Sequence, residues 1–114
     1  MEVDFRTKKM KKIASDYSKL QKVYGKHAKK IAMRLQQLSA AYSLQIYAQL
    51  DPLARLHQLT GDRDGPFAVE ITGNFRLIFE IANTPIPRTD EGEEIDRSRV
   101  TKIKVIELSE DYHG

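Results

Sequence analysis

The amino-acid sequence predicts an α+β fold, with two helices packed on one face of a small, mostly antiparallel sheet. Helical periodicity dominates the first half of the chain, and two-residue alternation dominates the second half. The pair Gly73-Asn74 separates two alternating segments, as the turn of a β-hairpin does. A length of 114 residues suits one hydrophobic core. We therefore take residues 1–114 as a single domain.

The chain begins with a predicted strand followed by a predicted helix. Residues 2–6 alternate, with Val3 and Phe5 on one side, which indicates a short, half-buried strand. Thr7 is a suitable N-cap for a helix that runs to Tyr24, where Gly25 provides a C-terminal stop.

A second helix is predicted over residues 26–41, and a short helical segment over residues 44–50. The short segment should end before Pro52, because a residue that precedes proline is disfavoured in helical geometry. Both long helices are amphipathic. Their apolar faces are expected to contain Leu20, Tyr24, Ala28, Ile31, Leu35, Leu38 and Tyr42.

The second half of the chain reads as strands at residues 55–60, 66–72, 74–82 and 100–108. In the hairpin strand, Arg76 falls on the face opposite Phe75 and Leu77, so it should project from the polar side. Residues 83–99 contain two prolines, and five acids lie between Asp90 and Asp96, which predicts a long solvated loop. The face of the sheet without helices is left for a ligand.

Composition excludes several classes of protein. The chain has no cysteine, so disulfides, thiolate nucleophiles and cysteine-ligated metals are excluded, and a reducing compartment is favoured. No apolar run approaches the ~20 residues of a membrane span, and the N-terminus lacks the apolar region of a signal peptide. We expect a cytoplasmic protein without a membrane partner.

Charge is divided unevenly along the chain. Residues 1–50 carry 11 Lys and Arg against 3 Asp and Glu, whereas residues 51–114 carry 8 against 13. Such a one-sided positive field attracts a polyanion, and RNA binding is one interpretation. A solvated helix face that only keeps the protein soluble is the other. The lysines that form this stripe at 100° per residue are Lys19, Lys22, Lys26, Lys29 and Lys30.

Three segments carry residues that could do chemistry. They are the predicted strand and charged turn with His57 and Arg63, the hairpin with Arg76, and the last residues, 111–113. Each also has a plain structural interpretation: a structural histidine, a surface arginine and a frayed end. There is no nucleotide-binding glycine motif, and the histidines lack metal-ligand spacing, so we expect neither cofactor nor metal.

RNA is a substrate that this set of residues could cleave. Its 2′-hydroxyl is an internal nucleophile, so an enzyme needs only a base, an acid and cations around the charged phosphorane. Histidine and arginine supply these functions, and a tyrosine or aspartate can orient or replace them.

The sequence resembles the RelE/ParE superfamily of toxins, and above all its HigB-type branch, the "plasmid maintenance killer" proteins. The likeness lies in LHQLTGDRDG (residues 56–65), FAVEITGNFRLIF (67–79) and the final DYH (111–113). The helical run YGKHAKKIAMRLQQLSAA (24–41) is also similar. The four motifs occur in the family's order and span nearly the whole chain.

The resemblance implies a RelE-like microbial RNase fold and the toxin of a type II toxin–antitoxin pair. It implies an endoribonuclease that cleaves mRNA on the ribosome. It further implies a helix-turn-helix, HigA-like antitoxin and contact with operator DNA only through the toxin–antitoxin complex. By resemblance the catalytic residues are His57, Arg76, Asp111, Tyr112 and His113, and Arg63 contacts RNA. We expect the end of the sheet to hold Asp111–Gly114 at its edge, beside His57.

One position departs from the family pattern, and two other functions remain open. Thr60 stands where HigB-type toxins commonly have lysine, which removes one cation from the expected site. A ParE-like poison of DNA gyrase would have no need of acid–base residues such as His57. A non-enzymatic RNA- or DNA-binding module would use its histidines only structurally.

Overall fold

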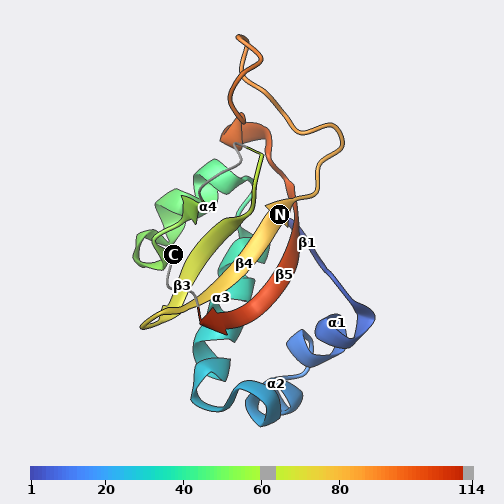
Figure 1. Ribbon diagram of the computed structural model, residues 1–114, viewed down its shortest axis with the longest axis vertical. Coiled ribbons are helices and arrows are strands. Elements are labelled where there is room, and N and C mark those ends of the chain that lie inside the picture. Colours follow the sequence, from blue (N-terminus) through green and yellow to red (C-terminus); the bar gives the residue numbers. More distant parts are fainter. Residues whose placement is uncertain (60–63, 112–114) are drawn as a thin grey trace.

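The computed structural model describes residues 1–59 and 64–111, and within them it forms a five-stranded sheet covered by helices (Figure 1). The sheet order is β1-β5-β4-β3-β2. β1 runs parallel to β5, and the other neighbours are antiparallel. The predicted α+β class is confirmed. The strands are β1 (Glu2–Phe5), β2 (His57–Gln58), β3 (Phe67–Thr72), β4 (Phe75–Ile81) and β5 (Lys102–Asp111).

The helices contribute their apolar side chains to one face of the sheet. α3 passes behind the sheet. α1 and α2 lie near the N-terminal end of α3, and α4 lies near its C-terminal end (Figure 1). No helix in the described ranges is long and apolar enough to cross a membrane. The helices are α1 (Lys8–Ala14), α2 (Tyr17–Tyr24), α3 (Ala28–Ala40) and α4 (Leu44–Leu50), with 3-10 turns at Gly25–His27, Pro52–Ala54 and Arg97–Arg99.

The predicted single helix over residues 7–24 is wrong, because the chain breaks between α1 and α2. Asp16 adopts an extended backbone, and its Oδ1 accepts hydrogen bonds from the backbone N–H groups of Ser18 at 3.0 Å and Lys19 at 3.4 Å. Aspartate is among the preferred N-cap residues, so it starts a new helix at this point. The predicted cap at Thr7 and the stop at Gly25, where φ is 54°, are confirmed.

The second helix begins and ends slightly inside its predicted range. A 3-10 turn occupies Gly25–His27, so α3 starts at Ala28. Ala41 is extended and ends the helical period, which explains why Tyr42 is 77% exposed and does not join the predicted apolar face. The predicted segment Leu44–Leu50 is confirmed as α4, capped by Ser43.

The hairpin strands alternate as predicted. Val69, Ile71, Leu77 and Phe79 face the helices and belong to the hydrophobic core. On the other face, hereafter the open face, Ala68 is buried outside that core. The other strands differ from prediction in length: β2 has only two residues, and β5 extends to Asp111 with two irregular register steps against β4.

A buried ion pair joins α3, α4 and β3. The guanidinium of Arg34, which is 2% exposed, contacts the Asp51 carboxylate at 2.9 Å and donates from Nε to the Glu70 carbonyl at 2.8 Å. The Tyr47 hydroxyl donates to the same carboxylate at 2.9 Å. Burial, and then the charge of Asp51, raises the pKa of Tyr47. This network fixes α4 and the segment after it against the sheet.

The long segment between β4 and β5 is tied to the rest of the molecule. The Arg88 guanidinium contacts both carboxylate oxygens of Asp64, at 2.7 and 2.8 Å. Hydrogen bonds from Ser98, and then from Arg99, lower the pKa of the Asp96 carboxyl. The segment is therefore held to the rest of the fold by specific contacts, although residues 90–94 are exposed, as expected of a solvated loop.

Candidate functional site

The structure divides the predicted site residues between the two faces of the sheet. His57 pairs with Ala68 and Ala68 with Ile78, so the three share the open face. Arg76 pairs with Glu70 and lies on that face as well. β3 separates His57 on β2 from Arg76 on β4, and Arg76 lies two residues along β4 from Ile78, which is in register with His57. Roughly 10 Å or more therefore separates the Cα atoms of His57 and Arg76.

His57 is held in one tautomer by its own turn. Its Nδ1 lies 2.9 Å from the carbonyl oxygen of Arg55, which can only accept a hydrogen bond. The proton of a neutral ring is therefore on Nδ1, and Nε2 keeps a lone pair that can take a proton. Arg55 has φ of 52°, a strained left-handed backbone that positions this carbonyl. The side chain of His57 is exposed, so a substrate can reach it.

Arg76 stabilises the hairpin turn. Its Nη1 donates to the carbonyl of Gly73 at 2.6 Å and to that of Phe75 at 3.1 Å. In register it stands between Glu70 on β3 and Glu110 on β5. The guanidinium thus has a structural role in addition to the expected one at the site.

Two arginines beside the open face are accompanied by carboxylates. Arg6 lies 3.2 Å from Glu107, and Arg55 lies 3.6 Å from Glu70. Ion pairs that are this exposed stabilise a fold by only ~0–1 kcal/mol, but they cancel charge locally. The open face is consequently mixed in charge.

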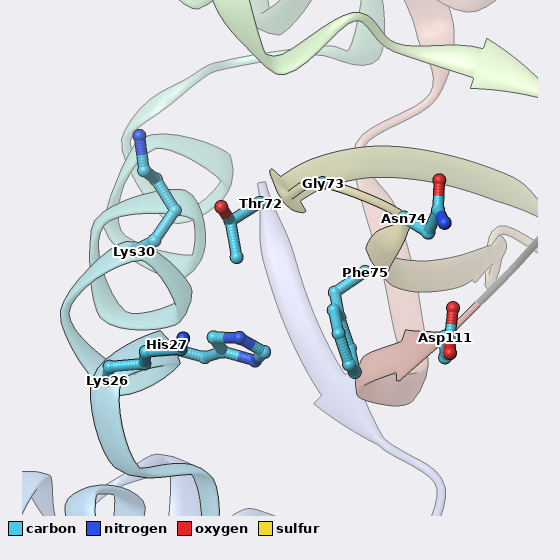
Figure 2. A pocket seen from close by; sticks show the side chains of 8 residues that line it. All are labelled: Lys26, His27, Lys30, Thr72, Gly73, Asn74, Phe75 and Asp111. Carbon is cyan, nitrogen blue, oxygen red and sulfur yellow. The ribbon is translucent and has the colours of Figure 1, made fainter.

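A pocket of about 690 Å³ opens at the end of the sheet, between α3 and the β3–β4 hairpin (Figure 2). Lys26 and His27 from the 3-10 turn before α3, with Lys30 of α3, form one wall, and the hairpin and the end of β5 form the other. Its lining residues are Lys26, His27, Lys30, Thr72, Gly73, Asn74, Phe75 and Asp111.

His27 is the residue of this pocket that sequence reasoning passed over. Its Nδ1 lies 3.1 Å from the Ser109 hydroxyl, and its ring lies 4.4 Å from the Phe75 ring at a tilt of 59°. The two partners are far from His27 in sequence, so no local motif points to them. The nearby lysines and the aromatic residue after Gly73-Asn74 are the only signals that the sequence offers.

All five lysines of the predicted stripe are exposed, as expected. Lys26, Lys29 and Lys30 line a second hollow of about 320 Å³ on the outer side of α3. Within residues 1–59 and 64–111 no carboxylate lies within ion-pair distance of any of the five. Their positive charge is therefore concentrated on the helical side of the molecule. Lys19 and Lys22 lie on α2.

The expectation that the chain end lies at a sheet edge beside His57 is wrong for Asp111. β5 lies between β1 and β4, and β3 and β4 separate it from β2. Asp111 pairs with Phe75, whose side chain packs against the core, so this carboxylate belongs to the pocket side. The remaining predicted site residues, Arg63, Tyr112 and His113, lie outside the described residues, as does Thr60.

The residues that the structure describes contain no cluster of three or more His, Cys, Asp or Glu that could hold a metal ion. The site consists instead of an exposed imidazole on the open face and a basic, partly aromatic pocket at the end of the sheet.

Comparison with protein families gives one match. The family model of the HigB-like toxins, described as the RelE-like toxin of the type II toxin–antitoxin system HigB, matches residues 3–90. This range includes His57, Arg76 and the lysine stripe, but it ends before β5 and Asp111. Neither the curated proteins nor the solved structures contain a match.

Proposed function

The chain belongs to the HigB-like toxins of type II toxin–antitoxin systems, and from that premise we propose that it is a ribosome-dependent endoribonuclease. Membership makes the protein a toxin with a cognate antitoxin. In the proposed reaction the 2′-hydroxyl of the mRNA attacks the adjacent phosphorus, a base removes its proton, and an acid protonates the departing 5′-oxygen. The P–O5′ bond breaks and leaves a 2′,3′-cyclic phosphate. Translation stops because messages are cut.

The contact between His57 Nδ1 and the Arg55 carbonyl, on an exposed side chain, is the observation that carries this proposal. A base needs a free lone pair within reach of the substrate, and Nε2 meets both conditions while Nδ1 is engaged by Arg55. Tyr112 and His113 are proposed to provide the acid and to orient the scissile nucleotide. Arg76, with Arg63, is proposed to stabilise the phosphorane.

The partners follow from the charge distribution and the family. We propose that Lys19, Lys22, Lys26, Lys29 and Lys30 hold ribosomal RNA, since they form a positive surface without carboxylate partners among the described residues. The antitoxin is proposed to be a HigA-like helix-turn-helix protein that brings the complex to operator DNA. We propose that the toxin acts in the cytoplasm, where ribosomes and messages are found.

His57→Ala tests the proposed reaction. Removing a positioned base typically lowers a rate by ~10²–10⁴, so cleavage of a message in a translating extract should fall by that factor. The melting temperature should hardly change, because the side chain is exposed. Gln49→Ala, an exposed change on α4, is the matched control and should cleave normally.

Two outcomes would contradict the catalytic assignment of His57. Near-normal cleavage by His57→Ala would remove its role as base. A wild-type protein that arrests growth but cuts no message, and instead traps gyrase on DNA, would favour a gyrase-directed toxin.

Arg76 requires a paired comparison because it also stabilises the hairpin. Arg76→Ala should abolish cleavage, whereas Arg76→Lys should retain the positive charge but only part of the hydrogen bonding to Gly73 and Phe75. Cleavage rates and amide NMR spectra of the hairpin should be measured together. Full activity in Arg76→Ala would exclude a role for this residue in catalysis.

A further inference from the structure

The pocket between α3 and the β3–β4 hairpin contains a preformed aromatic pair. Phe75 packs one part of its ring against the core and presents the rest to the pocket, where His27 approaches it at 4.4 Å. The hydrogen bond with Ser109 fixes the His27 ring. Such a partly exposed, immobilised ring face is what an unpaired base stacks on.

The wall of the pocket that carries His27 is cationic. Lys26 and Lys30 stand one helical turn apart on that wall (Figure 2), and no carboxylate of the described residues pairs with either. The arginines beside the open face, Arg6 and Arg55, are matched by glutamates instead. A phosphate at this pocket therefore meets two lysines that are not engaged by a carboxylate of the described residues.

The hairpin leaves room beside the rings. Gly73 has φ of 54°, and a Cβ at this position would meet no atom within 4 Å, so the tip of the hairpin borders open space. Thr72, next to Gly73, carries a hydroxyl that can hydrogen-bond the edge of a base. A volume of about 690 Å³ is within the ~300–1,000 Å³ typical of small-ligand sites.

We propose that this pocket is a subsite for one unpaired RNA nucleotide, with the base on Phe75 and His27 and the phosphate on Lys26 and Lys30. The inference rests on the proposed function, since it names where a further nucleotide of the bound RNA is held. Asp111 lies on the wall opposite the lysines. The subsite uses the helical side of the sheet, whereas His57 lies on the open face.

Binding to the isolated toxin tests the subsite without cleavage. The probe is a six-nucleotide single-stranded RNA with 2′-O-methyl groups, which cannot be cut because its nucleophile is blocked. Adding it should shift the ring signals of His27 and Phe75 in NMR spectra. Inorganic phosphate alone should perturb Lys26 and Lys30 but leave the Phe75 signals in place.

Variants separate the stacking contribution from the charge. Phe75→Leu should weaken binding of the RNA by roughly 5- to 100-fold, the decrease expected for one stacked base, while Phe75→Tyr should retain it. The double variant Lys26→Gln/Lys30→Gln should reduce the log–log salt slope by about 0.7 for each lysine that no longer binds a phosphate. Lys9→Gln, an exposed change on α1, is the matched control and should leave affinity unchanged.

The outcomes distinguish the subsite from the reaction. Unshifted Phe75 signals, or equal affinity in Phe75→Leu and wild type, would overturn the subsite even if messages are still cleaved. A Phe75→Leu protein that binds RNA poorly yet cleaves messages at the normal rate would overturn its role for the substrate. Loss of binding and of cleavage together, with both restored in Phe75→Tyr, supports it.

Discussion

Arg34 is a charged side chain inside the hydrophobic core, and three groups make its burial tolerable. The Asp51 carboxylate neutralises it, the Glu70 carbonyl accepts from its Nε, and Tyr47 satisfies the other side of the carboxylate. Among the described residues no buried side-chain polar atom lacks a partner. Arg34 therefore connects two helices and a strand through directional interactions that apolar packing alone would not provide.

Asp51→Asn should destabilise the protein strongly. The substitution keeps the shape of the side chain but leaves the guanidinium of Arg34 buried without its counter-ion, which typically costs about 3–5 kcal/mol. Urea unfolding monitored by circular dichroism measures the difference. Glu107→Gln is the matched control: it breaks the exposed pair with Arg6 and should cost at most about 1 kcal/mol. Equal effects of the two variants would contradict a distinct role for the buried pair.

At the scale of elements, the strands and helices follow the sequence wherever a local signal is strong. Thr7, Gly25, the Gly73-Asn74 turn and α4 are where local chemistry predicts them. The break at Asp16 is not predicted, although an N-cap residue is present, because the helical period of the flanking residues continues through it. Local capping outweighs periodicity at that point.

The positions of site residues can be predicted from the sequence only where they depend on neighbouring residues in the same strand or helix. His57 and Arg76 lie on one face because alternation along a strand determines which side each residue takes. The hydrogen bond of His27 with Ser109 spans 82 positions and depends on how α3 meets β5, which no local pattern encodes. The central position of β5 is also a tertiary property, so the sequence could not reveal that Asp111 lies away from His57.

The lysines of α2 and α3 should determine the salt dependence of ribosome binding. If they bind RNA phosphates, affinity falls with salt at a log–log slope of about −0.7 per phosphate. Lys22→Glu with Lys29→Glu should flatten that slope, and the preference for message sequence should stay the same. Lys9→Glu with Lys12→Glu, equal in charge change but on α1, is the control. A salt slope that does not change in the lysine variant would show that the stripe does not bind RNA and only keeps the protein soluble.

At the scale of the whole molecule, the positive charge of the lysine stripe and the proposed catalytic base are on different sides of one sheet. The stripe lysines lie with the helices, and the proposed base His57 lies on the open face. RNA that touches both sides can pass around the end of the sheet at the β3–β4 hairpin, where Asp111 of β5 pairs with Phe75. We therefore expect RNA to meet the chain where β5 ends.

Ending the chain at Glu110 should separate folding from activity. Only Asp111 of the removed residues belongs to a described strand, where it pairs with Phe75, so the core remains intact. The melting temperature should fall by a few degrees at most, and antitoxin pull-down should succeed, while message cleavage is abolished. A truncated protein that still cleaves messages would show that His57 works without Asp111, Tyr112 and His113.

The parallel pairing of β1 with β5 has a consequence for the order of folding. Glu2 pairs with Lys102, so closing this part of the sheet requires segments 100 positions apart to meet. Pairings so distant in sequence slow folding, because the entropy of closing the loop is lost before the strands associate. Until β5 inserts, β1 and β4 each present an unpaired edge that another chain could join. A slow insertion of β5 thus leaves newly made toxin open to aggregation, in proportion to its concentration.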